Sequence, residues 1–151
     1  MNIFRQSFFL LSAITVVSPF LIGADDGRVA QCDRISTVVT TAAAETQAIS
    51  SSNNPDKIAE LLRAADTVDR HAKELEAVRV QDAKLKALQA SFISMYRDTS
   101  RYSRSLVVAA KAQDVEAVKS SLQSLQEATG RESSLVNEFN RYCRGKLPRS
   151  N

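Results

Sequence analysis

The chain has 151 residues, of which 44% are hydrophobic and 25% are charged, and its formal net charge is +3. This composition is that of one globular domain and excludes a disordered chain. Basic and acidic residues are interspersed, whereas a nucleic-acid-binding protein concentrates basic residues on one face, so we expect no nucleic-acid partner. Glycine (4) and proline (3) are scarce and helix-forming residues are plentiful, which predicts an all-α fold.

The first 24 residues have the pattern of a secretory signal peptide. A short positive segment ends at Arg5, an uncharged run follows, and small residues at its end place a cleavage site after Ala24. The alternative is an uncleaved N-terminal membrane anchor, because the run approaches the roughly 20 residues that span a bilayer. Both interpretations predict export, to the periplasm or the extracellular space. We expect residues 25–30 to be a linker and, after cleavage, no stable membrane insertion.

Four amphipathic helices are predicted in the rest of the chain, over 31–51, 55–79, 82–112 and 114–144. In each of them apolar residues recur at spacings of three and four residues, which places them on one helix face. In the first helix the run Thr-Thr-Ala-Ala-Ala over 40–44 places small residues along the helix. That helix can therefore approach a neighbour closely but buries little apolar area.

Capping residues define the boundaries of these helices. Asn54 and Pro55 suit the cap and the first position of the second helix. A Gln-Asp pair occurs twice, and its aspartates, Asp82 and Asp114, each precede a new apolar stripe. We expect them to cap the third and fourth helices, and Gly145 to stop the last one.

The fourth helix is predicted to be visibly longer than the first. Its apolar stripe consists at first of Val115, Val118, Leu122 and Leu125, and it resumes beyond Gly130. We expect the hairpin of the third and fourth helices to project beyond the other pair. The alternative is a bend at Gly130, where glycine weakens a helix.

Short connections force neighbouring helices to run antiparallel, so the pattern predicts an up-down-up-down four-helix bundle over 31–145. In this topology the start of the first helix and the end of the fourth lie side by side at one end. Cys32 and Cys143 fall at these two points. We therefore expect one structural disulfide, which is consistent with an exported protein.

No catalytic or cofactor-binding constellation is found in the sequence. His71 is the only histidine, and its neighbours Asp69 and Glu74 are expected to be ordinary solvated residues. No Cys-x-x-Cys or Gly-x-Ser-x-Gly motif occurs. A b-type haem held by His71 and Met95 is a minor alternative, since both residue types are axial ligands. We expect no enzyme, no metal and no cofactor.

Two basic stretches are candidate contact surfaces. Between residues 95 and 104 aromatic residues alternate with arginines, which favours stacking and phosphate contact. The candidate residues are Tyr96, Arg97, Arg101 and Arg104. A solvated helix face with Tyr102 turned inward is the simpler interpretation. A projecting hairpin would carry this segment on or near the projection.

The second basic stretch is the C-terminus, with a tail over 146–151. Its candidate residues are Arg141, Arg144, Lys146 and Arg149. Basic residues stabilise a helix C-terminus, and they also bind an anionic membrane or cell-wall polymer.

Together these features predict an exported, non-enzymatic helical-bundle protein. We expect an interaction or structural module of the cell envelope, which binds a protein or another envelope component through its helix faces. The alternative is a carrier of a small ligand or cofactor, held in a cavity of the bundle core.

Overall fold

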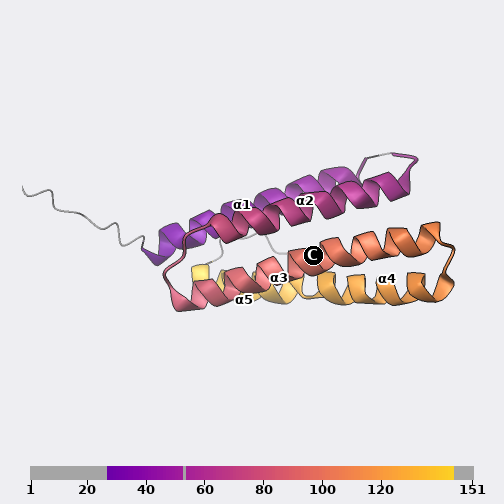
Figure 1. Cartoon of the computed structure of the whole chain (residues 1–151). Coiled ribbons are helices and arrows are strands. Elements are labelled where there is room, and N and C mark those ends of the chain that lie inside the picture. Colours follow the sequence, from indigo (N-terminus) through magenta and orange to yellow (C-terminus); the bar gives the residue numbers. More distant parts are fainter. Residues whose placement is uncertain (1–26, 53, 145–151) are drawn as a thin grey trace, which may run out of the picture.

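The computed structural model describes residues 27–52 and 54–144, and these residues form an all-helical structure. The helical segments are α1 (Arg28–Ser50), α2 (Lys57–Ala77), α3 (Ala83–Lys111), α4 (Val115–Gly130) and α5 (Glu132–Cys143). They form the predicted four-helix bundle, in which α4 and α5 follow each other in the fourth position (Figure 1). The expected signal peptide and basic tail lie outside the described residues. Within the described ranges, no helix is both long and apolar enough to cross a membrane.

The predicted disulfide is confirmed. Cys32, near the start of α1, is bonded to Cys143, the last residue of α5, and their Cα atoms lie 5.8 Å apart. The bond joins positions that are 111 residues apart in the sequence. At the same end of the bundle, the Arg28 guanidinium lies 5.1 Å from the centre of the Tyr142 ring.

The caps of α3 and α4 are those predicted from the repeated Gln-Asp pair. The Asp82 carboxylate accepts a hydrogen bond from the Leu85 backbone N–H at 2.9 Å. The Asp114 carboxylate accepts one from the Ala117 N–H at 3.0 Å. Each aspartate thus satisfies a backbone donor that has no partner inside its helix.

The prediction for the start of α2 was wrong by two residues. Asp56, not Asn54, is the cap, since its carboxylate accepts a hydrogen bond from the Ala59 N–H at 2.9 Å. The Asn54 side chain accepts one from the Asp56 N–H at 3.0 Å and forms the turn before the helix. Pro55 therefore also precedes the helix. The negative charge of Asp56 suits the positive end of the helix dipole.

The last helix ends one residue earlier than expected. Arg144, with φ 57° and ψ 47°, is the left-handed residue that terminates α5. The expected stop residue, Gly145, lies outside the described residues.

The single helix predicted over 114–144 is interrupted. The break occurs at Arg131, directly after Gly130, where the sequence offered a bend as the alternative. Arg131 keeps right-handed dihedral angles, φ −73° and ψ −20°. The two segments consequently run roughly in line beneath α3 (Figure 1).

The apolar stripe that was expected to bury α4 is only partly covered, since Val118 and Leu125 are half-buried and the other two residues are exposed. Val115 is 75% exposed and Leu122 is 43% exposed, and Ala128 is the one buried residue of α4. The reason is geometric, because no Cα atom of α4 lies within 8 Å of one in α1 or α2 among the described residues. The α4 helix packs on α3 and α5 alone.

The densest core lies toward the disulfide end, where α1, α2, α3 and α5 meet. Phe92 of α3 and Phe139 of α5 are fully buried and pack edge to face, with ring centres 6.0 Å apart. Ile35, Leu75 and Leu85 complete this cluster and are also fully buried. The bundle is closed at the disulfide end and more open where α1 faces α4.

Candidate functional site

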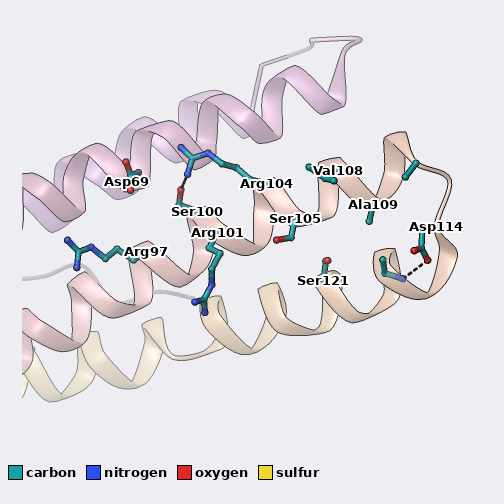
Figure 2. A pocket seen from close by; sticks show the side chains of 12 residues that line it. Asp69, Arg97, Ser100, Arg101, Arg104, Ser105, Val108, Ala109, Asp114 and Ser121 are labelled. Carbon is teal, nitrogen blue, oxygen red and sulfur yellow. Dashed lines mark hydrogen bonds between the residues drawn. The ribbon is translucent and has the colours of Figure 1, made fainter.

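A groove of about 690 Å³ runs along α3, between α2 and α4 (Figure 2). We call it the arginine groove, because Arg97, Arg101 and Arg104 line it. The helix period explains why they meet, since residues three and four apart share one face. The structure thus brings together three of the four residues predicted as a contact surface.

The fourth residue of that prediction, Tyr96, does not belong to the groove. Its side chain is only 5% exposed and forms part of the core, so it is not a surface residue. Tyr96 lies four residues after the fully buried Phe92, and this spacing places both on the core face of α3. Tyr102, expected to face inward, is half-buried and accepts a hydrogen bond from Arg101 at 2.8 Å.

Two of the three arginines pair with carboxylates of α2, which corrects the expectation that they sit on or near a projecting hairpin. Arg97 pairs with Glu76 of α2. Arg104 pairs with Asp66 of α2 at 2.7 Å, and it also donates to the Ser100 hydroxyl (Figure 2). These ion pairs connect the exposed edges of α2 and α3.

The arginines keep N–H donors that these ion pairs do not use. A guanidinium has five N–H donors, more than one carboxylate can accept. Arg101, whose side chain is 63% exposed, pairs with Asp98 at 2.8 Å and also lies over the Tyr102 ring. Exposed pairs of this kind contribute about 0–1 kcal/mol each, so a partner's carboxylate can compete for the arginines.

Small side chains and two aspartates, Asp69 and Asp114, line the rest of the groove. Ala109 and Ala112 come from α3, and Ala117 and Ser121 come from α4. Val108, which is 68% exposed, adds an apolar side chain to the same groove. A partner can approach the helix backbones closely here, and the three arginines of the groove outnumber its two aspartates.

The sequence contained a signal for part of this groove. Arg101, Arg104, Val108 and Ala112 follow helical spacing, so the contact face could have been extended past Arg104 toward the end of α3. No sequence pattern predicted that Ser121 of α4 lines the groove. Its place depends on the register between α3 and α4, which one helix does not reveal.

A second polar cluster joins α1 to α2, and it corrects the expectation that Glu74 is an ordinary solvated residue. The fully buried His71 ring lies between two carboxylates, with Nδ1 2.8 Å from Glu74 Oε2 and Nε2 3.0 Å from Glu45 Oε2. Arg70 pairs with both glutamates. A carboxylate lies within hydrogen-bond distance of each ring nitrogen, so neither nitrogen is left for a haem iron shared with Met95.

These contacts shift the pKa of both glutamates in the same direction. Hydrogen bonds from His71 and Arg70 hold the pKa of Glu45 below its ordinary value. Burial raises the pKa of Glu74, but hydrogen bonds from Arg70 and His71 outweigh this effect and lower it. Among residues 27–52 and 54–144, no group of three or more His, Cys, Asp or Glu side chains could hold a metal ion.

The predicted basic tail is only partly described. Arg141 and Arg144 are exposed, and Arg141 lies beside Lys84 and Glu138 at the disulfide end. Lys146 and Arg149 lie outside the described residues.

Comparison with known proteins gives no relative. No family model matches the chain, and neither a curated protein nor a solved structure matches it at a significant level.

Proposed function

We propose that this chain is an exported, non-enzymatic interaction module of the cell envelope, which binds a partner protein in the arginine groove. The observation that carries the proposal is the convergence of Arg97, Arg101 and Arg104 on one groove lined with small residues. The matching partner is an amphipathic helix with carboxylates on its polar face.

The shape of the groove favours a helix over other partners. It follows α3 between two flanking helices and is therefore elongated (Figure 2). Alanines and serines in its lining allow close approach, and Val108 offers an apolar contact, as in the helix-in-groove mode of recognition. Carboxylates of such a helix would pair with the guanidinium groups in bidentate geometry.

Two features support the exported and non-enzymatic parts of the proposal. Disulfides persist in oxidising compartments, and the Cys32–Cys143 bond follows a segment with a signal-peptide pattern. Both cysteines are consumed by that bond and His71 is held by two glutamates, so neither residue type is placed as a nucleophile or its base.

The test is site-specific photo-cross-linking in the native host. A photo-reactive amino acid at Ser105, inside the groove, should capture a defined partner protein. The same amino acid at Ala44, on the exposed face of α1, should not capture that partner.

Charge reversal then tests whether the partner binds through the arginine groove. Arg101→Glu should weaken the captured complex by about tenfold or more, because like charges meet the partner's carboxylates. Arg63→Glu, the same charge change on an exposed part of α2, should leave it intact. Equal capture at both positions, or capture that Arg101→Glu does not alter, would contradict the proposal.

A further inference from the structure

A second cavity, of about 270 Å³, lies between the C-terminal half of α1, the middle of α3 and the junction of α4 with α5. We call it the inner cavity. It exists because the α1 face at this level carries short side chains, among them Ala42 and Ala43, while α4 stays beyond 8 Å in Cα distance along the described part of α1. The side chains are too short to fill the space that remains.

Two hydroxyl groups of residues that line the inner cavity lack hydrogen-bond partners among the described residues, and one of them is a buried atom. Tyr96 is 5% exposed, and its hydroxyl makes no hydrogen bond within the described ranges. The Thr46 Oγ1 atom is buried and likewise has no partner there. Buried polar groups in native proteins are normally satisfied, so the unsatisfied Thr46 hydroxyl indicates that something else binds it, and the Tyr96 hydroxyl is a second group in the same lining that is open to a ligand.

The charge facing the inner cavity is negative. Glu132, at the start of α5, lines it and makes no ion pair or hydrogen bond to any other described residue. Burial raises the pKa of this carboxyl. Burial and then the nearby Glu132 charge raise the pKa of the Tyr96 hydroxyl. Among the residues that the structure describes, no lysine, arginine or histidine lines the cavity.

We propose that the inner cavity binds a compact organic cation, an amine whose ammonium group pairs with Glu132 and donates a hydrogen bond to the Tyr96 hydroxyl. The Thr46 hydroxyl accepts a further hydrogen bond. Met95 and Val68 contact the apolar body of the ligand. The volume lies near the lower end of small-molecule sites, which are about 300–1,000 Å³, so the ligand is small.

This site makes the chain a small-ligand carrier in addition to a binding module. It is independent of the arginine groove, because the two lie on different faces of α3 and no described residue lines both. The competing occupant is water, of which about nine molecules at roughly 30 Å³ each would fit. Water satisfies the hydroxyls but does not neutralise Glu132.

The experiment compares three probes of one shape and different charge: benzylamine, benzyl alcohol and benzoate. We expect benzylamine to give a saturable rise in the melting temperature of the oxidised, full-length protein, and the other two to give little or none. Butylamine, which is smaller, covers the case in which the ring is too large.

Variants then assign the site. Glu132→Gln keeps the side-chain shape and should weaken amine binding by about tenfold or more, and Tyr96→Phe should weaken it by a smaller factor. Glu138→Gln, on α5 but outside the cavity, and Arg101→Glu, in the arginine groove, should bind as the unaltered chain does.

Two results would overturn the proposal. If benzyl alcohol binds as well as benzylamine, the cavity is merely apolar and Glu132 selects nothing. If neither amine shifts the melting temperature, the cavity holds water only. Because circular dichroism reports folding of each variant, loss of structure is separated from loss of binding.

Discussion

At the scale of single residues, Gln113 in the turn between α3 and α4 is in an unfavourable conformation. Its φ of 57° lies in the left-handed region, which costs an L-residue about 1–2 kcal/mol. Glycine avoids this cost but loses more chain entropy on folding. We expect Gln113→Gly to raise the free energy of unfolding by about 0.5–1 kcal/mol, measured by urea denaturation.

The other Gln-Asp pair supplies a matched control. Gln81 also precedes a capping aspartate, but among the described non-glycine residues only Gln113 and Arg144 have positive φ. Gln81→Gly should therefore lower stability, since it adds flexibility without relieving strain. A loss of stability in both variants would mean that the left-handed conformation of Gln113 carries no cost.

The glutamates around His71 predict a pH dependence. Contacts with Arg70 and His71 lower the pKa of Glu45 and Glu74 from the ordinary value of 4.5. A depressed pKa stabilises the fold above the unfolded-state value, and this stability is lost as the pH falls through the folded-state value. We therefore expect stability to fall below about pH 4.5 and Glu45→Gln to flatten that fall.

Urea denaturation at several pH values between neutrality and about pH 3 measures this effect. Glu116→Gln, at the exposed start of α4, is the control and should keep the unaltered pH profile. If Glu45→Gln keeps it as well, the His71 cluster does not contribute to acid sensitivity.

The sequence alone predicted those features of the structure that depend on neighbouring residues. Asp82 and Asp114 cap helices through backbone groups three residues away, so each cap is visible in a short stretch. Tyr96 was misplaced because the alternation of aromatics and arginines describes composition and ignores helix phase. Counted from Phe92, the period of the helix assigns Tyr96 to the core.

At the scale of elements, the partly exposed stripe of α4 shows what helical periodicity does not predict. The spacing of Val115, Val118 and Leu122 gives the apolar face of a helix correctly, but it does not say whether another helix covers that face. Here α1 remains too distant. The inner cavity results from the same separation, so neither it nor the role of Glu132 could be predicted from the sequence.

The interruption between α4 and α5 predicts an effect at Gly130. A Cβ atom added at Gly130 would meet nothing within 4 Å. Because glycine in a helix costs about 1 kcal/mol relative to alanine, Gly130→Ala should raise the free energy of unfolding by about 0.5–1 kcal/mol. Ala128→Gly, at a buried position two residues earlier, should lower it. Destabilisation by Gly130→Ala in urea denaturation would show that the break requires glycine.

At the scale of the whole molecule, the disulfide decides whether the bundle stays closed. It joins α1 to α5, which form the first and fourth positions of the bundle, at the end where the core is densest. The topology, and with it this bond, could be predicted because four helices with short loops permit few arrangements. Closing a loop of 111 residues restricts the unfolded chain and stabilises the fold by roughly 4–5 kcal/mol.

We therefore expect reduction, or the double variant Cys32→Ser with Cys143→Ser, to lower the free energy of unfolding by roughly 4–5 kcal/mol. Urea denaturation measures this loss. Native domains have only about 5–15 kcal/mol in total, so the reduced protein should be close to unfolding at ambient temperature. Reductant should have no effect on the double variant. Amide exchange should rise first at the start of α1, which the bond holds against α5. Equal stability of the oxidised and reduced forms would mean that helix packing alone closes the bundle.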